Sequence, residues 1–148
     1  SHATCLDTSP PIFYMNDVSR AIVYLVHAFN DAYGEVRLGY TFDAGPNAVL
    51  MVQKQHAAEA LAAVLKYFPP AEHAAEGYVN RPELQTAAEA VTLPAALFAT
   101  FAAPPQPGAV RYVYHTKVGP GAALLGEASS LAGADGKPLH PSTQQRVH

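Results

Sequence analysis

The segment from Asn16 to Gly34 constrains the fold most, because it carries a complete set of helix signals. Apolar side chains recur along it at steps of three and four residues, which gathers them on one face of an α-helix; they are Val18, Ile22, Leu25, Val26, Phe29 and Tyr33. Asn16 and Asp17 suit a helix start, and Gly34 suits the left-handed residue after a last turn. We therefore predict an amphipathic helix over residues 17–33.

Two short β-rich runs follow this helix, at residues 36–42 and 48–52. The residues between them include Gly45 and Pro46, which do not readily continue a strand. We therefore predict two neighbouring strands joined by a special turn. A second helix is expected over residues 55–68, where apolar residues share one stripe until Pro69-Pro70 ends it.

Downstream of this second helix the pattern is weaker. Short helices are expected near residues 83–90 and 93–102, between prolines. Residues 109–118 alternate like an edge strand, with Tyr112 and Tyr114 on a face expected to cover the sheet. Residues 119–148 have little periodicity and are expected to form a loop-rich tail. This order predicts an α+β fold, with helices packed on one face of a mainly antiparallel sheet that upstream strands would complete.

Composition excludes several classes of protein. The chain has 148 residues, of which 49% are hydrophobic and 14% charged, which indicates one folded domain rather than a disordered segment. Nine Lys and Arg against twelve Asp and Glu, without a basic run, argue against nucleic acid as a partner. The longest nearly apolar stretch, residues 93–103, is too short for a helix to cross a bilayer core of about 30 Å, so a soluble protein is expected.

The Cys and His residues give no signal for a metal site or a disulfide. Cys5 is the single cysteine, which excludes an internal disulfide and fits a reducing compartment best. The histidines share no ligand spacing, so we expect solvated histidines or histidines at the edge of the core, and no metal. Cys5 itself is expected to pack as a small apolar residue.

Asp43 is the most informative ionisable residue. It stands where the first predicted strand ends, between apolar runs, so we expect partial burial, which would raise its pKa and suit it for taking or orienting a proton. Gly45 would let a ligand approach closely, because it has no side chain. The alternative is that Asp43 only accepts hydrogen bonds from backbone N–H groups of its own turn, as aspartates in turns commonly do.

The block around Asp43, Asp-Ala-Gly-Pro-Asn-Ala at residues 43–48, closely resembles a segment of the eukaryotic diphosphomevalonate decarboxylases. The resemblance continues in the same order along almost the entire chain. Further similar blocks occupy residues 2–8, 10–14, 16–17, 67–70, 116–121 and 135–138. An ordered series of unrelated blocks is far more specific than any one of them.

The resemblance implies a member of the GHMP kinase superfamily. The 148 residues would be one segment of its ferredoxin-like C-terminal domain, lacking upstream elements, with a core at about 1–118 and a tail at 119–148. The implied activity converts mevalonate 5-diphosphate and ATP into isopentenyl diphosphate, ADP, phosphate and CO2, in the mevalonate pathway to isoprenoids and sterols. Asp43 corresponds to the family's essential aspartate, which orients or deprotonates the C3 hydroxyl. Its neighbours in the turn would support it; these are Ala44, Gly45, Pro46 and Asn47.

The resemblance also implies partners outside this segment. ATP and Mg2+ would be bound mainly by the N-terminal domain of the same enzyme, so this segment alone is not expected to catalyse. Gly119-Pro120-Gly121 is no phosphate cradle, because it lacks the length and the following helix. A homodimer and a cytoplasmic location are implied, with a peroxisomal location left open.

A rival hypothesis is a non-catalytic α+β module that binds a small ligand or mediates dimerisation. A closed pocket formed within these residues would favour that module. Asp43 at the mouth of a cleft would favour a piece of an enzyme.

Overall fold

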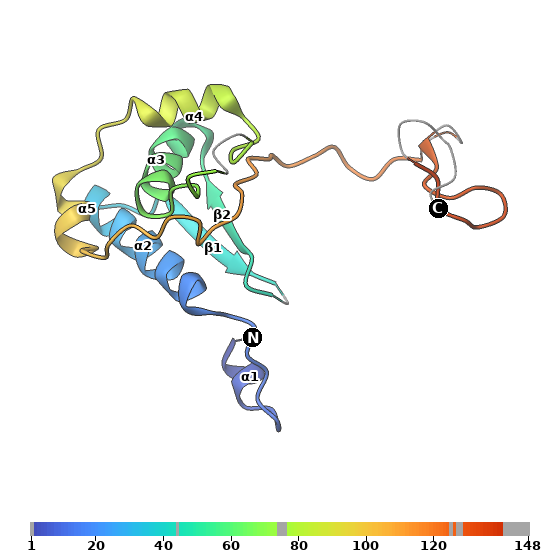
Figure 1. Ribbon diagram of the computed structural model, residues 1–148, viewed down its shortest axis with the longest axis horizontal. Helices are drawn as coiled ribbons and strands as arrows, with labels where there is room; N and C mark the ends of the chain where they lie inside the picture. The colour runs from blue at the N-terminus through green and yellow to red at the C-terminus, as the bar shows by residue number, and fades with distance from the viewer. Residues whose placement is uncertain (1, 44, 74–76, 125, 127–128, 141–148) are drawn as a thin grey trace. The chain divides into compact units, whose positions relative to one another are not determined.

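The computed structural model describes residues 2–43, 45–73, 77–124, 126 and 129–140. The chain divides into two compact units, Ser1–His115 and Thr116–His148, which are described separately. The first unit carries the helices and strands (Figure 1), which are α1 (His2–Leu6), α2 (Asp17–Tyr33), β1 (Leu38–Phe42), β2 (Ala48–Val52), a 3-10 turn (Lys54–His56), α3 (Ala57–Tyr67), α4 (Pro82–Glu89) and α5 (Ala95–Thr100).

Helix α2 confirms the predicted helix at both ends. Its N-cap is Asn16, whose Oδ1 accepts a hydrogen bond from the Ser19 N–H at 2.8 Å. Gly34 ends the helix with φ 67°, the left-handed conformation that favours glycine. The inner face buries Leu25 and Phe29, which are 2% and 0% exposed.

The two predicted strands are confirmed as an antiparallel hairpin. Leu38 lies opposite Val52 at one end, and Phe42 lies opposite Ala48 at the other. Strand β1 begins two residues later than predicted, because Val36 stays outside the ladder and is exposed. One face of the hairpin packs into the core through Leu38 and Leu50, while alternate residues such as Met51 remain exposed.

The side chain of Asn30 in α2 fixes where β1 begins. Its Oδ1 accepts hydrogen bonds from the Arg37 N–H and the Leu38 N–H, both at 3.0 Å. Its Nδ2 donates to the Leu38 carbonyl at 2.8 Å. The backbone of Leu38 is therefore satisfied by a helix side chain, which ties the hairpin to α2.

The remaining helices complete an α+β arrangement, as predicted. Helix α2 packs against β1, α3 and α5, and α3 packs against α4. The main core joins these elements through Phe29, Ala63, Phe68 and Leu97, each 1% exposed or less. A smaller cluster contains Leu61, Ala62, Tyr78, Val79 and Ala88. No helix within the described residues has the length and apolar character needed to cross a membrane.

The predicted strand at residues 109–118 is wrong. Only Val113 forms a bridge, with Val79, and its N–H donates to the Tyr78 carbonyl at 2.7 Å. The predicted facing is also reversed, because Tyr112 and Tyr114 are 53% and 67% exposed whereas Val113 packs into the smaller cluster. The two tyrosine rings contact each other, at 5.0 Å between centroids, instead of covering the sheet.

The second unit, Thr116–His148, is irregular in its described part. Ala132 and Pro138 form an isolated antiparallel bridge, closed by a hydrogen bond from the Gly133 N–H to the Lys137 carbonyl at 2.9 Å. Gly119 and Gly121 lie outside any helix or strand.

Candidate active site

Asp43 lies directly after β1, at the start of the turn that leads to β2. Phe42 before it is buried, with 7% of its surface exposed, whereas Asp43 is exposed. The expected partial burial of Asp43 is therefore not found in this chain. The physical reason is the alternation of the strand, which directs Phe42 into the core and its neighbour away from it. Exposure leaves the carboxylate accessible to groups that this chain does not supply.

The turn between the strands is closed by its own backbone. The Gly45 N–H donates to the Asp43 carbonyl at 2.7 Å. Ala44 lies outside the described residues. Pro46 and Asn47 are exposed beside Asp43, so the four described residues of the predicted site do lie together in one turn.

Among the described residues, nothing around Gly45 requires a glycine. Its φ lies outside the left-handed region, and a Cβ placed on it would meet no described atom within 4 Å. Neither backbone strain nor crowding therefore demands a glycine. Open space beside Gly45 is consistent with the interpretation that an external group approaches the backbone there.

The start of α2 contacts this turn. The Ser19 hydroxyl lies 3.2 Å from the Pro46 carbonyl oxygen and is oriented to donate to it. Ser19 is 0% exposed. Asn16 is a typical N-cap residue, so the start of the helix was predictable, but the contact of Ser19 with Pro46 spans 27 sequence positions and left no local signal.

An aromatic cluster supports the strand end before Asp43. The Phe42 ring lies 6.1 Å from the Tyr40 ring and 6.2 Å from the His2 ring, and His2 in turn lies 5.3 Å from Tyr14. The Nδ1 atom of His2 is buried and has no hydrogen-bond partner among the described residues. Sequence reasoning did not single out His2, because an isolated histidine near a chain end carries no pattern.

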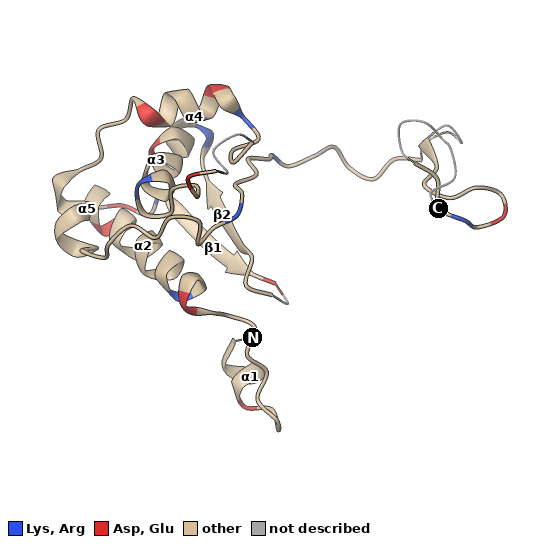
Figure 2. Ribbon diagram, viewed as in Figure 1, with Lys and Arg blue, Asp and Glu red and all other residues tan. Residues whose placement is uncertain are grey.

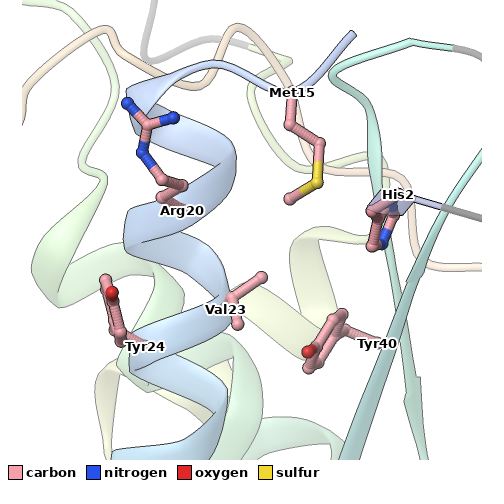
Figure 3. Close-up of a pocket in the computed structure, with 6 residues that line it drawn as sticks. All are labelled: His2, Met15, Arg20, Val23, Tyr24 and Tyr40. Atoms are coloured by element: carbon pink, nitrogen blue, oxygen red, sulfur yellow. The ribbon is translucent and has the colours of Figure 1, made fainter. Parts of the chain in front are cut away.

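A hollow of about 190 Å³ lies between α2 and β1 (Figure 3), and Asp43 does not line it. Its walls are His2, Met15, Arg20, Val23, Tyr24 and Tyr40. A second hollow of about 320 Å³ is open to solvent beside the far end of the hairpin, around Gly39 and Met51. Ligand pockets usually enclose about 300–1,000 Å³, so the first hollow is small and the second is too open to enclose a ligand. Neither of these two hollows is a closed pocket of the kind expected for a binding module.

The charged residues do not form a phosphate-binding set around the turn. Figure 2 shows the basic residues spread over separate elements. Arg20 pairs with Asp17, Arg37 with Glu35 and Glu59, and Arg81 with Glu83. Among the described residues, no three His, Cys, Asp or Glu side chains lie close enough to share a metal ion. The described residues therefore do not fit a site that holds nucleotide phosphates and Mg2+ by themselves.

The fold and the turn define the class of the protein: an α+β domain of the GHMP C-terminal type, with an acidic residue exposed at a hairpin turn. Residues 1–125 match the family described as "Mevalonate 5-diphosphate decarboxylase C-terminal domain". The chain belongs to this family.

Individual relatives agree with this membership. The diphosphomevalonate decarboxylase of Rattus norvegicus is 48% identical over 138 residues, which cover 93% of this chain and 33% of that protein. The Homo sapiens relative is 44% identical with the same coverage. The structure of mevalonate diphosphate decarboxylase from Trypanosoma brucei matches with a TM-score of 0.71 at 32% identity, covering 88% of this chain and 34% of that one. The chain thus spans about a third of the length of these relatives.

Proposed function

We propose that this chain is the C-terminal part of an ATP-dependent decarboxylase that converts mevalonate 5-diphosphate into isopentenyl diphosphate, ADP, phosphate and CO2. The single observation that carries the proposal is the position of Asp43: an exposed carboxylate, at the start of the hairpin turn, in a member of this family. The product places the reaction in isoprenoid and sterol biosynthesis.

In the proposed reaction, Asp43 orients the C3 hydroxyl of the substrate or accepts its proton as the hydroxyl oxygen bonds to the γ-phosphorus. The bond from that phosphorus to the bridging oxygen breaks at the same time, and its electron pair leaves with ADP. Positioning carries much of such a transfer, because the attacking oxygen must be aligned with the phosphorus. The C3–O bond then breaks with its electron pair leaving on phosphate. The C–C bond to the carboxylate supplies the electrons of the new double bond, and CO2 departs. A carboxylate beside C3 would also stabilise the positive charge that develops there.

We further propose that ATP and Mg2+ are bound mainly by residues outside this chain. Mg2+ would neutralise the charge of the nucleotide phosphates during transfer. Two observations support this division: the paired state of Arg20, Arg37 and Arg81, and the coverage of only a third of each relative. A homodimer in the cytoplasm is part of the same proposal, and size-exclusion chromatography with light scattering tests its oligomeric state.

The test is a chimera in which this chain replaces the matching third of the rat relative. We expect the chimera to release CO2 from mevalonate 5-diphosphate in the presence of ATP. Asp43→Asn is expected to lower its turnover by about 10²-fold or more, the scale of a positioned acid or base. Asp31→Asn, an exposed carboxylate in α2, is the matched control and should leave turnover unchanged.

Two outcomes would contradict the proposal. Near-normal turnover in Asp43→Asn would remove the assigned role. A folded but inactive chimera would instead favour the non-catalytic module. The 148-residue chain alone is expected to show no ATP-dependent decarboxylation, and measurable turnover would contradict the division of the site.

A further inference from the structure

Ser19 is a fully buried polar residue at the start of α2. It is 0% exposed and occupies the third position of α2. Its Oγ accepts a hydrogen bond from the Asn16 N–H at 3.3 Å. Two acceptors lie within reach of its own proton, the Asn16 Oδ1 at 3.0 Å and the Pro46 carbonyl at 3.2 Å.

A hydroxyl has one proton, so it donates to one of these acceptors at a time. The Asn16 Oδ1 already accepts the Ser19 N–H at 2.8 Å, which completes the capping box without the hydroxyl proton. The Pro46 carbonyl gains a partner only if the Ser19 hydroxyl donates to it, as far as the described residues show. We therefore assign the hydroxyl proton to the hydrogen bond with the Pro46 carbonyl, 27 positions further along the sequence.

We propose that Ser19 is a positioning residue for the decarboxylation, because it holds the turn that carries Asp43 against the start of α2. This inference rests on the role proposed above for Asp43. The carboxylate lies between two anchors, the buried Phe42 ring before it and the Pro46 carbonyl after it. Between these two anchors, the Gly45 N–H donates a hydrogen bond to the Asp43 carbonyl.

Without Ser19, the turn loses its hydrogen bond to the start of α2. A hairpin loop of five residues then has several accessible backbone conformations. A displacement of about 1 Å in a group that positions a reacting atom can lower a rate by about 10²-fold. Loss of the Ser19 hydroxyl should therefore act on turnover more than on nucleotide binding.

The test compares Ser19→Ala with Tyr67→Phe in the chimera with the rat relative. Both variants remove a buried hydroxyl that donates to a distant carbonyl, since the Tyr67 hydroxyl donates to the Phe101 carbonyl at 2.9 Å. Of these two hydroxyls, that of Ser19 contacts the turn and that of Tyr67 does not. We expect kcat to fall by about tenfold or more in Ser19→Ala, with an unchanged KM for ATP and an unchanged kcat in Tyr67→Phe.

Hydrogen exchange measured by mass spectrometry supplies a readout independent of activity. Amides of the turn should exchange faster in Ser19→Ala, while those of α3 should not. If Ser19→Ala does not fold, Ser19→Cys replaces it, because a thiol is close in size and a weak donor.

If Ser19→Ala and Tyr67→Phe have equal kcat values while Asp43→Asn is still impaired, the positioning role of Ser19 is overturned and the proposed function stands. Unchanged hydrogen exchange of the turn amides in Ser19→Ala would likewise overturn the positioning role alone. Normal turnover in Asp43→Asn would overturn the positioning role together with the proposed function.

Discussion

Replacing Asn30 by alanine should destabilise the chain by removing the contacts that begin β1. Asn30→Ala deletes one donor and one shared acceptor, hence three hydrogen bonds to the backbone of Arg37 and Leu38. Each such bond contributes about 0.5–1.5 kcal/mol net, so their joint loss is about 3 kcal/mol. Alanine recovers roughly 0.5 kcal/mol through its higher helix propensity. The expected loss in the free energy of unfolding is therefore about 2–3 kcal/mol.

Urea unfolding of the chain, followed by far-ultraviolet circular dichroism, measures this loss. A slope of about 1–3 kcal/mol per molar urea converts it into a midpoint lower by roughly 0.7–3 M. Asp31→Ala is the control, because Asp31 is the exposed neighbour on the same helix. Asn30→Asp should fall between the two, since it keeps an acceptor for the N–H groups and loses the donor to the Leu38 carbonyl. Equal midpoints for Asn30→Ala and Asp31→Ala would refute the reasoning.

Two further predictions concern Gly45 and Tyr78. Gly45→Ala should change the free energy of unfolding by no more than about 0.5 kcal/mol, because a Cβ meets no described atom there. The same variant should lower kcat of the chimera about tenfold. An unchanged kcat would show that no external group approaches the backbone at Gly45. Burial raises the pKa of Tyr78 to about 12, above the value of 10.0 for a free tyrosine. Tyr78 therefore ionises at lower pH in the unfolded state than in the folded state. Its contribution to the free energy of unfolding is fully present below pH 10 and is lost between pH 10 and 12. Urea midpoints measured over this range should decline less in Tyr78→Phe, and an identical decline would contradict the assignment.

Elements whose signals lie within themselves were predictable from the sequence. Helix α2 was predicted at both ends because Asn16 and Gly34 act on the backbone beside them. The hairpin was predicted because Gly45 and Pro46 interrupt two apolar runs. Local steric and hydrogen-bonding rules decide such features, and a single sequence contains them in full.

Features that depend on distant partners were missed or wrong. Residues 109–118 alternate like a strand, but alternation does not show whether a neighbouring strand exists. Within the described part of this segment, only Val113 forms a bridge, an isolated one with Val79. The contacts of Asn30 with Leu38 and of Ser19 with Pro46 join segments that no local pattern links. The burial of Asp43 was overestimated because its flanking residues are apolar, whereas strand alternation sends only Phe42 inward.

The candidate site consists of the exposed Asp43 and a turn that the start of α2 contacts through Ser19. The first turn of α2 must satisfy N–H groups that no helical carbonyl reaches, and Asn16 and Ser19 do so. Because the Ser19 hydroxyl accepts from the Asn16 N–H, its own proton is available to two acceptors, the Asn16 Oδ1 and the Pro46 carbonyl, and we propose that it serves Pro46. The residues that begin the helix thus also fix the turn. An aspartate on a turn held in this way can remain exposed, because the hydrogen bond from Ser19 acts on the backbone of the turn and not on the carboxylate. If rigidity instead came from the strands alone, Ser19→Ala would leave both the exchange of the turn amides and kcat unchanged.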